Sequence, residues 1–186
     1  MNYRECVIFS GETFLVPEHI QRIEIHPTVT GGATYGWQVR YGNDEPIYGD
    51  HSADGSGAEA SLLAATEELL HRIHTNEAPS GLRKTISASK KSDLPPGISG
   101  PILRPPGKRK VAQYYFGISI PLFGRKPTNT SVYIGTENTA AQRYDLALAK
   151  AIQVRNRAEV AFQIAVTEAK RSATPLPSKL RKASRK

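Results

Sequence analysis

The chain has 186 residues, 39% of them hydrophobic, a formal net charge of +8 and a single cysteine, Cys6. One cysteine excludes an intrachain disulfide framework and a thiolate-rich metal site. No apolar run approaches the roughly 18 residues of a membrane span, and the first residues lack the apolar stretch of a secretion signal. We therefore expect no membrane partner and no secretion.

The positive charge is confined to one half of the chain. Residues 1–78 contain four Arg and twelve Asp or Glu, a balance of −8, whereas residues 79–186 contain 21 Lys or Arg and five acids, a balance of +16. Solubility alone does not require opposite charges in the two halves. The asymmetry therefore points to a polyanionic partner for the second half, while phosphate repels the first.

Residues 1–78 alternate apolar and polar side chains as half-buried strands do. The alternation covers residues 20–25 and 36–41, and a turn precedes a short third strand at 47–48. A helix is predicted from the capping box Ser56-x-x-Glu59 to about Thr75. The pattern indicates an acidic β-β-β-α domain.

Two segments lack the periodicity of a packed element. Residues 79–97 are rich in Ser, Pro, Gly and Lys and lie where the charge changes sign, which indicates a linker. Residues 172–186 hold five cations and few apolar side chains, so we expect a disordered basic tail. The predicted organisation is an acidic domain at 1–78, a linker at 79–97, a basic domain at 98–171 and a tail at 172–186.

The basic domain repeats the order of the acidic one. Candidate strands cover 98–103, 111–120 and 132–135, and the capping box Thr139-x-x-Gln142 opens a helix that reaches Arg171. In the middle strand, one face carries Ala112, Tyr114, Phe116, Ile118 and Ile120, and the other carries Gln113, Tyr115, Gly117 and Ser119. We predict an α+β fold of two β-β-β-α units, each a three-stranded antiparallel sheet packed on one helix, the second with a long C-terminal helix.

Cations lie in both turns beside this second sheet. Residues 104–110 and 123–131 combine Gly and Pro with Lys and Arg, which suits contacts to two phosphate strands. Aromatic and hydrogen-bonding groups between them suit recognition in a groove. The alternative is an ordinary solvated sheet with basic turns. The candidate DNA-binding residues are Arg104, Lys108, Arg109, Lys110, Gln113, Tyr115, Ser119, Arg125, Lys126 and Tyr133.

A set of residues between 97 and 157 follows a known pattern. It comprises Gly97-Ile98-Ser99, the alternation Tyr114/Phe116/Ile118, the segment Val132-Tyr133-Ile134-Gly135-Thr136-x-x-Thr139 and an Ala-rich helix with Tyr144-Asp145. These residues resemble the DNA-binding domain of the plant ethylene-response-factor (Apetala-type) family, which also occurs in bacterial and phage proteins. The resemblance implies a three-stranded sheet backed by one helix, with the sheet in the DNA major groove. The acidic domain resembles it as a degenerate copy.

The resemblance gives only limited information about the DNA-binding roles of single residues. It makes Tyr133 a DNA contact and puts two further contact positions at Gly117 and Ser119. The family usually has Glu and Arg there, and Gly and Ser cannot make the same bidentate contacts. The spacing from Gly135 to Tyr144 is also close to one helical turn shorter than in the family. Phosphate binding is therefore better supported than base readout.

No motif in the chain indicates an enzyme. The five histidines all lie in the acidic half, and His71 and His74 share a helix face without a cysteine or a convincing acidic third ligand. A Gly-rich phosphate loop and a Gly-x-Ser-x-Gly elbow are both absent. We predict no catalytic residue, no metal and no cofactor.

The sequence thus predicts a DNA-binding regulatory or accessory protein, for instance in transcription, of a phage or mobile element. It would bind duplex DNA with the second sheet. We expect it in the cytoplasm, associated with the nucleoid, or in a nucleus. The acidic domain would bind a protein, including another copy of the chain. One alternative is a double-stranded RNA binder, since such domains also mix three strands with helices. The other is a protein-interaction module that acts through the acidic domain and the overhanging helix residues Val154, Ala158, Phe162, Ile164 and Val166.

Overall fold

The structure is a computed structural model that describes residues 1–29, 31–42, 44–88, 90, 92–106 and 111–174. The chain divides into two compact units, Met1–Pro79 with the residues from Thr167 onward, and Ser80–Val166. This division differs from the expected domains because residues 80–97 belong to the second unit and the last turns of the long helix belong to the first. The expected disordered tail lies, from residue 175, outside the described residues.

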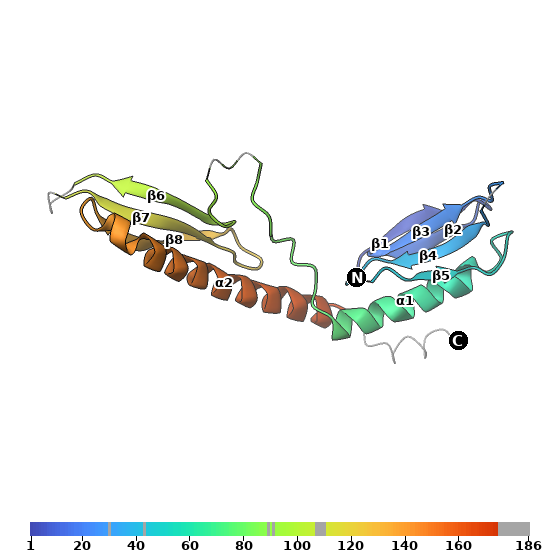
Figure 1. Ribbon diagram of the computed structural model, residues 1–186. Coiled ribbons are helices and arrows are strands. Elements are labelled where there is room, and N and C mark those ends of the chain that lie inside the picture. The colour runs from blue at the N-terminus through green and yellow to red at the C-terminus, as the bar shows by residue number, and fades with distance from the viewer. Residues whose placement is uncertain (30, 43, 89, 91, 107–110, 175–186) are drawn as a thin grey trace. The chain divides into compact units, whose positions relative to one another are not determined.

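The first unit is built from two antiparallel sheets and a helix (Figure 1). One sheet pairs β1 (Tyr3–Val7) with β2 (Thr13–Pro17), and the other has the order β3 (Ile20–Ile25), β4 (Thr34–Val39), β5 (Ile47–Gly49). Helix α1 (Ala58–Thr75) follows β5. The expected β-β-β-α order is confirmed in β3, β4, β5 and α1, and the β1–β2 hairpin precedes it as an element that the sequence pattern did not reveal.

Trp37, in β4, joins the β3–β5 sheet of this unit to the start of α1. The indole is fully buried, and its Nε1 donates a hydrogen bond of 2.8 Å to the carbonyl oxygen of Ala58. The expected capping box at Ser56 and Glu59 is wrong, because α1 begins after Gly57, which caps it with no side-chain hydrogen bond. Only glycine fits there, since a Cβ would overlap the carbonyl oxygen of Asp50.

The second unit is a three-stranded antiparallel sheet with one helix along it (Figure 1). The strand order is β6 (Ile98–Arg104), β7 (Gln113–Ile120), β8 (Thr128–Thr136), and α2 (Ala140–Ser172) follows. The strand β8 starts earlier than expected, because residues 128–131 pair with β7 instead of forming a turn. The predicted start of α2 is confirmed, and Thr139 Oγ1 accepts a hydrogen bond of 3.0 Å from the Thr136 N–H.

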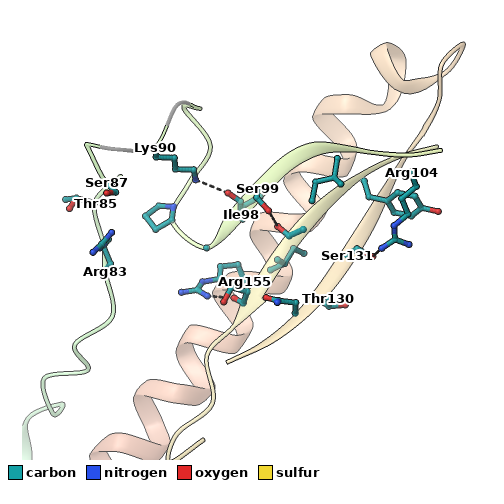
Figure 2. Close-up of a pocket in the computed structure, with 18 residues that line it drawn as sticks. Arg83, Thr85, Ser87, Lys90, Ile98, Ser99, Arg104, Thr130, Ser131 and Arg155 are labelled. Carbon is teal, nitrogen blue, oxygen red and sulfur yellow. Dashed lines mark hydrogen bonds between the residues drawn. The ribbon is translucent and has the colours of Figure 1, made fainter. Parts of the chain in front are cut away.

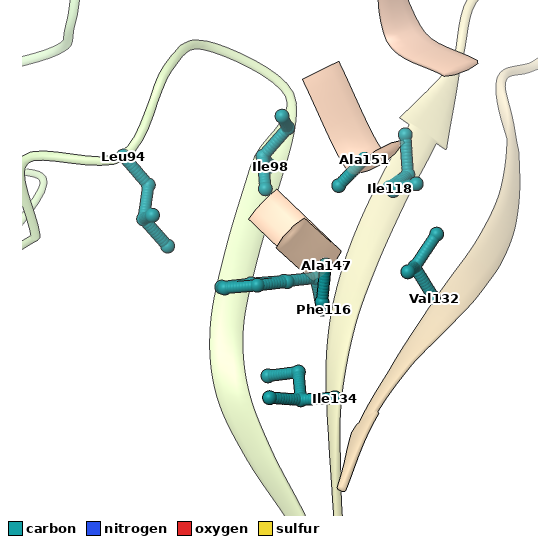
Figure 3. Packing of buried hydrophobic residues seen from close by; sticks show 8 residues of the cluster. All are labelled: Leu94, Ile98, Phe116, Ile118, Val132, Ile134, Ala147 and Ala151. Carbon is teal, nitrogen blue, oxygen red and sulfur yellow. The ribbon is translucent and has the colours of Figure 1, made fainter. Parts of the chain in front are cut away.

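One hydrophobic core holds this second unit together (Figure 3). It lies between one face of the sheet and α2, and Leu94 reaches it from the segment before β6. Small residues let the helix lie close on the sheet, which explains the Ala-rich stripe of α2. The predicted inner face of β7 is confirmed, with Phe116 and Ile118 buried and Tyr114 and Ile120 packed against them. The buried members are Leu94, Ile98, Phe116, Ile118, Val132, Ile134, Ala147 and Ala151.

Candidate nucleic-acid interface

The face of the β6–β8 sheet that points away from α2, here called the outer face, carries polar and aromatic side chains. Strand alternation and the register across the three strands bring these side chains side by side. None of the residues that form β6, β7 and β8 is Asp or Glu. The outer face comprises Ser99, Ile102, Arg104, Gln113, Tyr115, Gly117, Ser119, Asn129, Ser131, Tyr133 and Thr136, of which Ile102 is an exposed aliphatic side chain.

A chain of contacts orders the middle of the outer face. The Arg104 guanidinium lies 4.2 Å from the centroid of the Tyr115 ring, and its Nη2 donates to Ser131 Oγ at 3.5 Å. The Tyr115 hydroxyl donates a 2.5 Å hydrogen bond to Gln113 Oε1, and the Tyr115 ring contacts that of Tyr133. The aromatic, amide and cationic groups therefore form one continuous patch, in which Arg104 and Tyr133 are exposed and Gln113 and Tyr115 are half-buried.

Gly117 lies in the middle of this face. It has no side chain, but the space above its backbone is partly filled by residues of the neighbouring strand. A Cβ at Gly117 would lie 2.8 Å from Ser99 Oγ and 3.1 Å from Ile102 Cδ1, both on the neighbouring strand. The side chains of Ser99 and Ile102 therefore limit how closely a partner can approach the backbone at Gly117. A Cβ at this position would displace the Ser99 hydroxyl and the end of the Ile102 side chain.

One end of the second unit is hollowed into a cavity of about 810 Å³, which reaches onto the outer face (Figure 2). Arg155 of α2 lies in its wall although the side chain comes from the helix layer, and only 8% of the residue is exposed. Its Nε donates to Glu159 Oε1 at 2.6 Å, and its Nη1 donates to the carbonyl oxygen of Ser119. Gly97 makes room for it, since a Cβ there would lie 2.6 Å from the Arg155 Cζ.

The structure brings five of the ten candidate residues together. Arg104, Gln113, Tyr115, Ser119 and Tyr133 share the outer face or its rim, although Arg104 ends β6 instead of lying in a turn. Arg125 and Lys126 are exposed in the turn between β7 and β8. The remaining three, Lys108, Arg109 and Lys110, lie outside the described residues.

Sequence reasoning missed three cations that line the cavity. Arg83 and Lys90 belong to the segment that was expected to be a structureless linker, and Arg155 was hidden in the middle of a helix. No spacing or motif marks them, because they meet the sheet only through the path of the chain in three dimensions. Only the shift to positive charge at residue 79 indicated that the linker itself was basic.

Two further kinds of site were considered among the described residues, a metal centre and a membrane-spanning helix. Among them no group of three or more His, Cys, Asp or Glu side chains is placed to hold a metal ion. A search of the same residues finds no helix with the length and apolarity needed to cross a membrane.

The chain matches no model of a protein family, no curated protein and no solved structure in the comparisons made with each. The function is therefore inferred from the side chains of the outer face, their charge and their exposure.

Proposed function

We propose that the chain binds duplex DNA through the outer face of the β6–β8 sheet, as a regulatory or accessory protein. The observation that carries the proposal is the patch of Arg104, Tyr115 and Tyr133, which joins a cation to one half-buried and one exposed aromatic ring on a face without acids. Cations attract phosphate, and aromatic and amide groups contact sugars and base edges. The likeness to the ethylene-response-factor domain supports the same use of the sheet.

The net charge of the second unit favours DNA binding over the alternative of an ordinary solvated sheet. Residues 80–166, which form the second unit, contain 14 Lys or Arg and four Asp or Glu, a balance of +10. Binding to DNA releases counterions in proportion to the phosphates that such cations neutralise. The acidic residues 1–78 would not share this surface, and we propose that they bind protein, including a second copy of the chain.

The position of each side chain on the outer face or in the β7–β8 turn indicates its role in DNA binding. Arg104 on the rim, with the exposed Arg125 and Lys126 of the β7–β8 turn, would contact phosphates. Tyr133, Gln113 and Ser119 in the middle would reach sugars or base edges, with Tyr115 holding the Arg104 guanidinium and the Gln113 amide in place. This arrangement favours phosphate binding over strict base readout, because short Ser side chains dominate the centre.

The test places a negative charge on the outer face of the full-length chain. Ser131→Glu adds a carboxylate next to Arg104, while Gln142→Glu adds the same charge to the exposed surface of α2. In gel-shift titrations with a short duplex, we expect Ser131→Glu to weaken binding by about tenfold or more. We expect Gln142→Glu to stay close to wild type.

Two results would overturn the proposal. A wild-type chain that does not bind duplex DNA at low salt removes it altogether. Equal losses in Ser131→Glu and Gln142→Glu would mean that only net charge matters and that the outer face has no special role. A parallel titration with duplex RNA covers the RNA-binding alternative, which tighter binding to RNA than to DNA would favour.

A second candidate function rests on the exposed apolar side chains of α2. Ile164 is 53% exposed and Val160 is 60% exposed, and a protein partner would cover them. Of the other residues expected there, Val154 packs against the core and Phe162 contacts Phe123, with ring centroids 6.2 Å apart. The surface available to a partner is therefore smaller than the sequence suggested.

A further inference from the structure

The segment before β6 forms one wall of the cavity at the end of the second unit. Figure 2 shows Arg83, Thr85 and Ser87 on this segment, across an opening from the sheet residues Ser99 and Thr130. The segment and the sheet belong to the same compact unit. The cavity is therefore an open groove between a stretch of irregular chain and the sheet that carries the outer face.

Lys90 anchors the segment to the start of β6. Its ammonium group donates three hydrogen bonds, to the carbonyl oxygens of Leu94 at 2.6 Å, Pro95 at 2.8 Å and Ile98 at 2.8 Å. These bonds use all three donors of the ammonium group. Lys90 thus acts as a positioning residue that holds the chain close to the sheet, and its charge still adds to the potential of the groove.

The lining of the groove suits an anion. The 18 residues that line it include four cations and six Ser or Thr hydroxyls, and none of these lining residues is Asp or Glu. The cations come from three separate elements, since Arg83 and Lys90 belong to the segment, Arg104 to β6 and Arg155 to α2. A concave surface lined by one sign of charge concentrates the field within it.

From this geometry we infer that the groove holds a phosphodiester of one strand of the bound DNA, between the sheet and the segment residues Arg83, Thr85, Ser87 and Lys90. The inference rests on the proposed function and adds a second wall to that site. Ligand pockets of about 300–1,000 Å³ enclose drug-sized molecules, so a volume of about 810 Å³ has room for a short stretch of one backbone. The bases of that strand remain over the outer face, with which the groove is continuous through Ser99, Ser119 and Ser131.

Each cation has a distinct part in this site. Arg83 is exposed on the segment and contacts the phosphate directly, with the hydroxyls of Thr85 and Ser87 beside it. Arg155 is held by Glu159 and by the Ser119 carbonyl, so it forms a fixed wall of the groove. In this inference the described lining residues of the segment contact the DNA directly, which a tether that only adds diffuse charge would not do.

The test compares two neighbouring cations of the full-length chain. Arg83 lines the groove, while Lys84 is exposed beside it and is not among the lining residues. Arg83→Ala and Lys84→Ala remove the same charge from the same irregular segment, and thermal unfolding confirms that each variant folds. Affinity for a short duplex is measured between about 50 and 200 mM salt, and the slope of log affinity against log salt is compared.

We expect Arg83→Ala to flatten the slope by about 0.9, the value for one lost phosphate contact, and Lys84→Ala to keep the wild-type slope. Equal slopes for the two variants, at any affinity, would overturn the inference and leave the proposed function intact. If the wild-type chain does not bind the duplex, the proposed function fails and the inference fails with it.

Discussion

The rings of Tyr115 and Tyr133 lie side by side on the outer face, with centroids 5.3 Å apart and planes inclined by 56°. Tyr133 keeps 41% of its surface exposed, whereas its neighbours Val132 and Ile134 are buried against α2. The expected placement of Tyr133 away from the core is confirmed. The cross-strand partner supports one edge of its ring and leaves the remainder open to solvent.

Tyr133→Ala should therefore weaken DNA binding without unfolding the chain. We expect a loss of about 1–3 kcal/mol in binding, the range for an aromatic ring that contacts a base, and a small change in melting temperature. The control is Tyr144→Ala, because the Tyr144 ring packs on Phe116 in the core at a centroid distance of 5.2 Å. That variant should lose about 3 kcal/mol of stability. A Tyr133 variant with unchanged affinity would remove this side chain from the interface.

Arg104→Ala should weaken binding to all duplex sequences alike. The guanidinium lies at the rim of the sheet over Tyr115, where it is placed to contact phosphate. Removing one phosphate contact lowers the slope of log affinity against log salt by about 0.9. Arg143→Ala removes the same charge from the exposed surface of α2 and should leave the slope unchanged. A loss that depends on the duplex sequence would assign Arg104 to base readout instead.

A buried ion pair stabilises the first unit and provides a test of its core. Arg22 Nη2 lies 2.6 Å from Asp50 Oδ2, with the two side chains 6% and 0% exposed. Burial acts to lower the pKa of Arg22, but the hydrogen bonds that its guanidinium donates to Asp50 and Glu24 outweigh burial and raise that pKa. The guanidinium therefore stays charged and depends on its partners.

Asp50→Asn should destabilise the chain by about 3–5 kcal/mol, because it leaves the Arg22 charge buried without its main counter-ion. Urea unfolding followed by circular dichroism measures this loss. Glu45→Gln is the control, since Glu45 meets Arg40 at 4.0 Å on the surface, and exposed pairs contribute about 1 kcal/mol or less. Equal stability of the two variants would show that the buried pair contributes no more than the exposed one.

His19 should make the stability of the first unit depend on pH. Burial and the nearby Lys170 lower the pKa of His19 below its usual value, and Glu18 opposes them. The folded state thus favours the neutral ring, so its stabilising contribution is complete above a pH of about 6.5. It is lost as the pH falls through that value towards the lower pKa of the folded state.

Urea unfolding of the wild type and His19→Asn at several pH values between about 7.5 and 5.5 measures this contribution. Asn is suitable because His19 has a φ of 72°, a conformation that Asn tolerates. We expect the stability difference between the two chains to shrink as the pH falls. A difference that stays constant over the range would mean that His19 does not titrate with folding.

The sequence by itself determined the elements of the second unit and the two faces of its sheet. Alternation along β7 placed Phe116 and Ile118 inside and Tyr115 outside, because side chains of a strand point to opposite faces at every step. The Thr139-x-x-Gln142 pattern likewise predicted that α2 starts directly after Thr139. These are properties of local backbone geometry, so a single stretch of sequence contains them.

Only the tertiary structure decided how distant parts of the chain meet. Arg155 donates to the carbonyl of Ser119, 36 residues away in the sequence, and the side chain of Ser99 fills the space above Gly117. The groove beside Arg83 exists because Lys90 ties an irregular segment to β6. Such contacts depend on strand register and on hydrogen bonds to backbone carbonyls, which every residue type carries, so no pattern of side chains predicts them.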